Sequence, residues 1–296
     1  MATPARIRAL FLILLSVCCI RIRVRGQESL DALRQRAEKG NAEAQLRLGI
    51  MYRNGEGLRQ DLPEAAKWFR KAAEQGNAEA EDSLGFLYDY GGGVPIDHAE
   101  AAKWYRKAAD RGSADAALNL GWIYDSGQGF PEDHAEAVRW YRKAAELGND
   151  DAAFNLGVMY ENGQGAAQDF DQAAKWYRKA ADQGMHIAQL SLGRLYTRGR
   201  GVARDPAEAA RWYEKAADLG LATAQFELSL AYSRGEGVAK DPVVAYEWMD
   251  LAVFRALGAA KEKYSAARDA LGRGMTAEQM AEAKRRVEEW KTKWKK

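Results

Sequence analysis

Six tryptophans that stand 36 residues apart constrain the fold of this 296-residue chain more than any other feature. They are Trp68, Trp104, Trp140, Trp176, Trp212 and Trp248. A strict period of this length is typical of solenoids, in which each repeat packs only on its neighbours. In rows of 36 the chain aligns without an insertion, and the rows are 41–76, 77–112, 113–148, 149–184, 185–220 and 221–256.

The first half of each row predicts an amphipathic helix. In the first row Ala44, Leu48 and Tyr52 are four residues apart, so they share one helical face. A glycine follows the leucine in the first five rows, and Ser229 takes its place in the sixth. A glycine inside a helix costs about 1 kcal/mol relative to alanine. Its recurrence therefore predicts that the second helix approaches closely at this point.

A loop with two glycines, such as Gly55 and Gly57, follows the first helix in every row. No Gly-Lys-Ser/Thr sequence follows these glycines and no strand precedes them, which argues against a phosphate-binding loop. Glycine at a helix end commonly adopts a positive φ. We expect these pairs to end the first helix and to turn the chain.

The second half of each row opens with an aspartate, such as Asp61, followed three residues later by glutamate or glutamine in the first five rows. This pattern predicts a helix start with a capping box, not catalytic carboxylates. Ala65 and Trp68 belong to a broad apolar face of the helix. We expect the tryptophans to fill the core, so that Trp140→Ala costs roughly 3–5 kcal/mol.

These elements predict an all-α protein, a right-handed α-solenoid superhelix of six 36-residue helix-turn-helix repeats. Residues 27–40 match a lone second helix that caps the N-terminal side. Residues 257–296 predict C-terminal capping helices, whose Lys/Arg-rich end we expect to be solvated. We expect the protein to be a monomer.

Residues 1–26 are typical of a secretory signal peptide. Arg6 and Arg8 precede a short apolar run from Ala9 to Ile20, and we expect cleavage after Gly26. Three further arginines follow the run and oppose translocation, so an uncleaved anchor formed by residues 7–20 is the alternative. We expect the protein to be exported, periplasmic or secreted, and to touch a membrane only through this segment if it is uncleaved.

Residues 1–26, which we call the leader, also hold both cysteines of the chain, Cys18 and Cys19. "LSVC" at 15–18 faintly resembles a lipoprotein acylation site, but Val17 stands where a small residue is usual. Without the leader the chain has no thiol for a disulfide or for catalysis. It then holds 39 Lys and Arg against 42 Asp and Glu. This balance gives no support for nucleic-acid binding.

The repeat resembles the Sel-one-like repeat family, a branch of the tetratricopeptide-like superfamily. The resemblance rests on "AEAEDSLGFLYDYGGG" at 78–93 and "DHAEAAKWYRKAADRG" at 97–112, and it covers residues 41–256. The segment "TAEQMAEAKRRVEEW" is similar to the end of many bacterial members. The resemblance implies a non-catalytic adaptor that binds other proteins, often in the cell envelope or secretory pathway.

An alternative function comes from the same resemblance. Some bacterial members with paired cysteines in each repeat are linked to cell-wall or β-lactam ligands. The alternative is therefore an envelope protein that binds or hydrolyses peptidoglycan-type or β-lactam-type ligands. The repeats of this chain have no cysteine, and this absence weakens that version.

Related solenoids line their concave surface with the first helix. Positions of that helix whose residue varies from row to row, which we call variable columns, are therefore candidates for recognition. We predict a polarised groove in which acids surround the aromatic anchors Phe86 and Trp122 at one end and arginines stand at the other. A partner segment with Lys or Arg and an apolar anchor would suit the acidic half. The alternative is a solvated face whose charges serve solubility. The acids are Glu43, Glu79, Asp82, Asp89, Asp115, Asp125, Asp151 and Glu161, and the arginines are Arg194, Arg198 and Arg234.

No residue pattern predicts catalysis, a cofactor or a metal. His98 and His134 share one column just after the helix start, where we expect exposed side chains. A metal site needs convergent ligands, and none is evident. No serine lies in a nucleophile-elbow pattern. We therefore predict a protein that is not an enzyme.

Overall fold

The computed structural model describes residues 29–294, which form fifteen helices and no strand. The predicted signal segment, residues 1–26, lies outside the described residues. No helix within the described part is both long and apolar enough to cross a membrane. The helices are α2 Leu30–Glu38, α3 Ala42–Asn54, α4 Leu62–Ala73, α5 Ala78–Tyr90, α6 His98–Asp110, α7 Ala114–Ser126, α8 His134–Glu146, α9 Asp150–Asn162, α10 Phe170–Asp182, α11 His186–Arg198, α12 Pro206–Asp218, α13 Ala222–Arg234, α14 Pro242–Arg255, α15 Gly258–Gly272 and α16 Ala277–Trp294.

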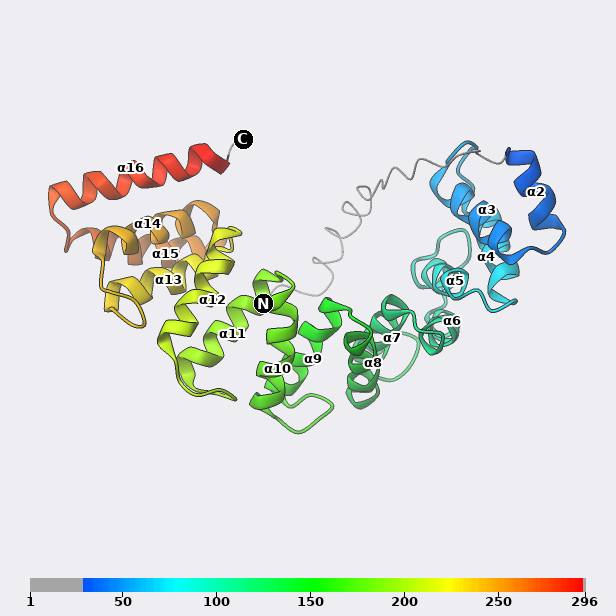
Figure 1. Cartoon of the computed structure of the whole chain (residues 1–296), viewed down its shortest axis with the longest axis horizontal. Coiled ribbons are helices and arrows are strands. Elements are labelled where there is room, and N and C mark those ends of the chain that lie inside the picture. The colour runs from blue at the N-terminus through cyan, green and yellow to red at the C-terminus, as the bar shows by residue number, and fades with distance from the viewer. Residues whose placement is uncertain (1–28, 295–296) are drawn as a thin grey trace.

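The helices form an α-solenoid, as predicted. In each row the first helix packs on the second, and the second packs on the first helix of the next row. Figure 1 shows the repeats following one another along an arc, from α2 at one end to α16 at the other. At the ends α2 packs on α3, and both α15 and α16 pack on α14.

Aspartate caps start the second helices, but the predicted capping box is only half present. The carboxylate of Asp97 accepts a hydrogen bond of 2.9 Å from the backbone N–H of Glu100. The backbone N–H of Asp97 donates to the carbonyl oxygen of Tyr88 at 2.9 Å and is not bound by the Glu100 side chain. Glu100 instead pairs with Lys103 at 2.8 Å. The reciprocal bond predicted from the sequence is therefore wrong, because the loop already uses that donor.

The glycine inside each first helix makes room for an aromatic ring. A Cβ atom at Gly121 would lie 2.7 Å from Cδ1 of Tyr141, a fully buried residue of the second helix. This geometry confirms the predicted close approach. In the sixth repeat Ser229 replaces the glycine, and the residue 20 positions later is the buried Met249 instead of an aromatic residue.

The second glycine of the loop contacts the preceding repeat. Gly165 has φ +68°, and a Cβ atom there would lie 2.1 Å from the carbonyl oxygen of His134. The loop therefore packs backbone to backbone on the start of α8. Gly57 of the first repeat has no repeat before it, and a Cβ there would meet only Met51 Cε, at 3.5 Å. The predicted positive φ is confirmed at both positions.

The tryptophans do not all belong to the core. Trp68, Trp104, Trp176 and Trp212 are 4–8% exposed. Trp140 and Trp248 are only half-buried. The indole N–H of Trp140 donates to Oε1 of Glu136 at 2.9 Å, which satisfies its polar atom near the surface. The prediction of a buried core tryptophan is therefore wrong for Trp140 and Trp248.

Candidate protein-binding surface

The first helices of successive repeats line one side of the solenoid. In Figure 1 α5 and α7 lie toward the inner side of the arc, and α6 and α8 lie toward its outer side. The structure also shows a direct contact between α5 and α7. The side-chain amide of Asn149, at the start of α9, donates a hydrogen bond of 2.9 Å to Oδ1 of Asp115 in α7. Residues that project from these helices can therefore form one continuous surface.

Acidic residues of α5, α7 and α9 share one electrostatic environment. The pKa of Asp82 is raised to about 7, first by burial and then by the negative charges of Asp115 and Glu79, against a lowering effect of Arg53. The pKa of Asp151 is also raised, by burial first and then by Asp150 and Asp115. Asp115 thus acts on carboxylates of both neighbouring helices.

The exposure of these acids differs. Glu43, Glu79 and Asp115 are exposed, whereas Asp82 and Asp151 are half-buried. The Oδ1 atom of Asp82 is buried and has no hydrogen-bond partner within the described part of the chain. A buried carboxylate oxygen without a partner disfavours the charged form, which agrees with the raised pKa of Asp82.

The aromatic residue most exposed on this surface is one that the sequence analysis did not select. Phe86 and Trp122 are half-buried and pack against the hydrophobic core. Tyr90, four residues after Phe86, is 42% exposed, and the centroids of the two rings are 4.5 Å apart. Tyr90 occupies the fourteenth position of its row, a variable column, and this position is the signal that could have identified it.

Three of the predicted recognition acids turn toward the second helix of their own repeat. Asp89 Oδ1 lies 2.7 Å from Nδ1 of His98, and its side chain is 3% exposed. Asp125 Oδ1 lies 2.8 Å from Nδ1 of His134. The hydroxyl of Tyr177 donates to Oε2 of Glu161 at 2.7 Å.

The predicted role in recognition is therefore wrong for Asp89, because a buried carboxylate does not face a partner. Asp125 and Glu161 join the two helices of a repeat, and the hydroxyl of Tyr141 also hydrogen-bonds to Asp125. These contacts correct a second expectation as well. His98 and His134 are half-buried, and the Nδ1 atom of each lies within hydrogen-bond distance of an aspartate, so they are not exposed.

The basic half of the surface is less uniform than predicted. Nη2 of Arg194 pairs with Glu227 of α13 at 3.0 Å, so its charge is neutralised between two first helices. Arg198 is exposed. The side chain of Arg234 is 58% exposed and lies 3.9 Å from Glu236. Arg198 and Arg234 are therefore the predicted basic residues that face solvent.

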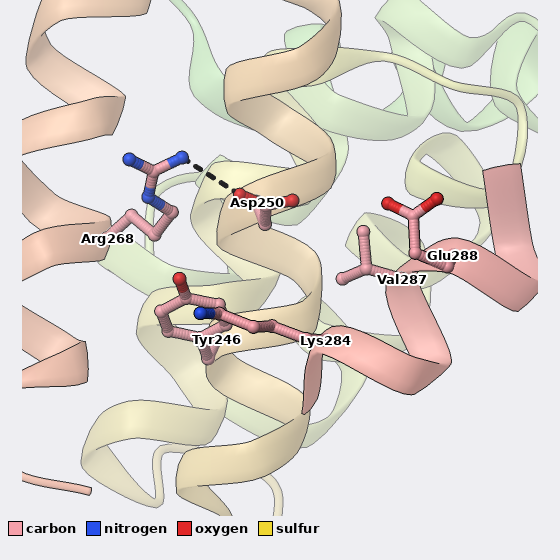
Figure 2. A pocket seen from close by; sticks show the side chains of 6 residues that line it. All are labelled: Tyr246, Asp250, Arg268, Lys284, Val287 and Glu288. Atoms are coloured by element: carbon pink, nitrogen blue, oxygen red, sulfur yellow. Dashed lines mark hydrogen bonds and ion pairs between the residues drawn. The ribbon is translucent and has the colours of Figure 1, made fainter. Parts of the chain in front are cut away.

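No group of three or more His, Cys, Asp and Glu among residues 29–294 is placed to hold a metal ion. A cavity of about 430 Å³ lies between α14, α15 and α16. Figure 2 shows its lining, in which Arg268 reaches Asp250 at 2.9 Å. Its lining residues are Tyr246, Asp250, Arg268, Lys284, Val287 and Glu288, and they include no serine, cysteine or histidine.

Comparison with solved structures identifies similar solenoids. The chain is 38% identical to c5321, a protective antigen of uropathogenic Escherichia coli strains with an SLR fold, and the TM-score is 0.77. This similarity covers 89% of the chain and 56% of c5321. A Sel1 repeat protein from Oxalobacter formigenes is 35% identical, with a TM-score of 0.60, over 76% of this chain and 87% of that one.

A shorter similarity links the chain to a curated protein. It is 47% identical over 45 residues to the secretory immunoglobulin A-binding protein EsiB of Escherichia coli. That stretch covers 15% of this chain and 9% of EsiB. The chain thus spans about half of c5321 and a small part of EsiB.

The repeat itself matches a known protein family along most of the chain. The family is described as Sel1 repeat, and the matched residues are 42–77, 78–113, 114–149, 150–185, 186–221 and 222–253. These stretches contain the six helix pairs α3–α4 to α13–α14, apart from the last residues of α14. The chain therefore belongs to the Sel1 repeat family.

Proposed function

We propose that this protein is an exported, non-catalytic adaptor that binds a partner polypeptide on the surface of its first helices. Sel1 repeat proteins generally mediate protein–protein interactions, and they are typically non-catalytic. The observation that carries the proposal is the group of carboxylates on α5, α7 and α9 beside the exposed ring of Tyr90.

The chemistry of this group favours a cationic partner segment. A Lys or Arg side chain placed near Asp82 would oppose the repulsion from Glu79 and Asp115 and would favour the charged form of Asp82. Tyr90 offers a large, amphipathic ring of the kind enriched at binding hot spots. The exposed Arg198 and Arg234 lie further along the chain, where an acidic part of the same partner would fit.

Export is part of the proposal. It rests on the signal-like residues 1–26 and on the similarity to a protein named as a protective antigen of uropathogenic Escherichia coli. The similarity to a protein that binds secretory immunoglobulin A is short, and it gives no reason to expect the same partner here.

A binding experiment tests the surface directly. The chain from residue 27 onward is used to capture cross-linked partners from a native envelope extract. The test variant is Glu79→Lys/Tyr90→Ala, which changes two exposed residues of α5. The control is Glu146→Lys/Ile96→Ala, which makes a similar change at an exposed acid of α8 and an exposed apolar residue of a loop.

We expect the wild type and the control to retain the same polypeptide and the test variant to lose it. Circular dichroism checks that all three proteins fold. If the test variant and the wild type retain the same partners, the first-helix surface is not the binding surface. Retention of cell-wall material alone would replace the adaptor function by binding of a wall ligand.

A further inference from the structure

Three strongly exposed apolar side chains belong to the C-terminal third of the chain. Leu219 is 53% exposed, Phe254 is 56% exposed and Leu257 is 85% exposed. Leu219 follows α12, whereas Phe254 and Leu257 flank the turn from α14 to α15. Gly220 lies against the guanidinium of Arg255, which brings the two segments together. We call these three residues the corner patch.

Leu257 is an unfavourable residue for the position that it occupies at the start of a helix. It is the N-cap residue of α15 and makes no side-chain cap hydrogen bond. Ser, Thr, Asp and Asn are preferred at this position because their side chains accept from the first backbone N–H groups. Two other helices also lack a polar cap, but their caps, Met185 and Leu221, are half-buried and pack against the core. Leu257 gains no such packing within the described chain.

Two cationic side chains lie beside Phe254 of the corner patch. Nζ of Lys291 lies 5.3 Å from the ring centroid of Phe254. The guanidinium of Arg255 lies 5.4 Å from the ring of Trp290. These two contacts place the end of α16 beside the end of α14. Lys291 also pairs with Asp250 at 3.5 Å and with Glu288 at 3.2 Å. Lys261 and Lys263 of α15, which follow Leu257 in the chain, are exposed as well.

The charge of the chain is polarised toward this end. Residues 255–296 hold 12 Lys and Arg against 6 Asp and Glu. Residues 27–254 hold 27 Lys and Arg against 36 Asp and Glu. An anionic surface therefore attracts the C-terminal end and repels the repeats.

We propose that the corner patch docks on an anionic lipid bilayer. Apolar side chains that protrude from a turn and are flanked by lysines can enter the interfacial region of a membrane while the cations meet lipid phosphates. Long lysine and arginine side chains keep their charged ends in the polar layer when their stems are buried. This contact is separate from that of the N-terminal segment, which is expected only if that segment is uncleaved. It does not depend on the partner proposed for the first helices.

Vesicle co-sedimentation tests this docking. The probes are vesicles of phosphatidylcholine alone and vesicles in which about a third of the lipid is phosphatidylglycerol. Two forms of the protein are used, the full chain and the chain from residue 27, which retains every described helix. We expect the shorter chain to bind the anionic vesicles about tenfold better than the neutral ones, and to lose most of this preference at high salt.

Matched variants separate the corner patch from a general effect of charge or hydrophobicity. Phe254→Ser/Leu257→Ser is compared with Ile96→Ser/Leu147→Ser, which changes two apolar residues that are 61% and 46% exposed on other repeats. The double change of Lys261 and Lys263 to glutamine is compared with the same change at the exposed Lys67 and Lys103 of the second helices.

We expect both C-terminal variants to reduce binding about tenfold and both controls to bind like the wild type. The proposal is wrong if neither lipid is preferred, or if the controls lose as much as the C-terminal variants. It is also wrong if only the full chain binds, because the contact then belongs to residues 1–26. Binding of soluble poly-glutamate without binding of vesicles would assign the corner to an acidic polypeptide instead.

Discussion

Nη2 of Arg106 donates a hydrogen bond of 2.6 Å to the hydroxyl of Tyr124, which lies on the first helix of the next repeat. The same contact recurs between successive repeats, always with a spacing of 18 residues. It joins Arg70 to Tyr88, Arg142 to Tyr160 and Arg178 to Tyr196. At the next junction Glu214 stands in place of the arginine, opposite Tyr232.

This interruption supplies a control within the same protein. We expect Tyr124→Phe to lower the free energy of unfolding by about 1 kcal/mol, because a charge-assisted hydrogen bond between repeats is lost. Tyr232→Phe should have a much smaller effect, because Glu214 occupies the position from which an arginine would donate. Urea denaturation measures both changes. Equal effects of the two substitutions would show that the arginine contacts contribute nothing to the repeat interfaces.

The loop glycines allow the coupling between repeats to be measured. We expect Gly165→Ala to destabilise the protein by more than about 2 kcal/mol, because the new Cβ would strain a positive φ and also press on the His134 carbonyl. Gly57→Ala carries a similar φ strain but meets no backbone atom within 4 Å, so we expect about 1 kcal/mol. Thermal and urea denaturation would contradict this account if the first substitution cost no more than the second.

The tryptophan column contains residues with different burial. We expect Trp176→Ala to cost roughly 3–5 kcal/mol, because its side chain is 7% exposed. Trp140→Ala should cost clearly less, since its ring is half-buried and part of its area stays in contact with water. Chemical denaturation of the two variants compares them directly, and the opposite order would mean that exposure does not govern this column.

The raised pKa of Asp82 predicts a pH dependence of stability. The folded protein keeps a proton on Asp82 up to about pH 7, whereas an ordinary aspartate, with a pKa of 3.8, loses it in much more acidic solution. Protonation of Asp82 therefore makes its full contribution to the free energy of unfolding below that lower pKa. This contribution is lost as the pH rises toward 7. Asp82→Asn should therefore stabilise the protein above pH 7, on the order of 2 kcal/mol, and should have little effect at low pH.

Denaturation of Asp82→Asn at several pH values between about 4 and 8 measures this difference. Glu43→Gln is the control, because it removes an exposed acid from a first helix at the N-terminal end of the same surface. A difference between Asp82→Asn and the wild type that did not change with pH would show that Asp82 ionises normally in the folded protein.

Signals that act over a few residues made the architecture predictable. Asp97 and its equivalents mark helix starts, and the paired glycines mark the ends of first helices, because caps satisfy backbone groups locally. The glycine at 121 also indicated a close helix contact, since its cost inside a helix needs compensation by packing. Repetition of these signals in six rows fixed the register of the whole solenoid.

The surface was less predictable, because the direction of a side chain depends on what lies across from it. Asp82 and Asp89 both belong to variable columns of α5, but Asp89 turns to His98 of α6 and is buried, whereas Asp82 joins the acids of the neighbouring helices. Tyr90 stays exposed although Phe86, one turn earlier, packs on the core.

The sequence by itself determined the number of repeats, their helices and their aspartate and glycine caps, because local hydrogen bonding and backbone sterics dictate these features. The tertiary structure alone decided which equivalent residues are buried. Trp140 and Trp176 occupy the same column, yet one bonds to Glu136 near the surface and the other is buried in the core. Burial depends on the neighbouring side chains of adjacent repeats, which the column position does not specify.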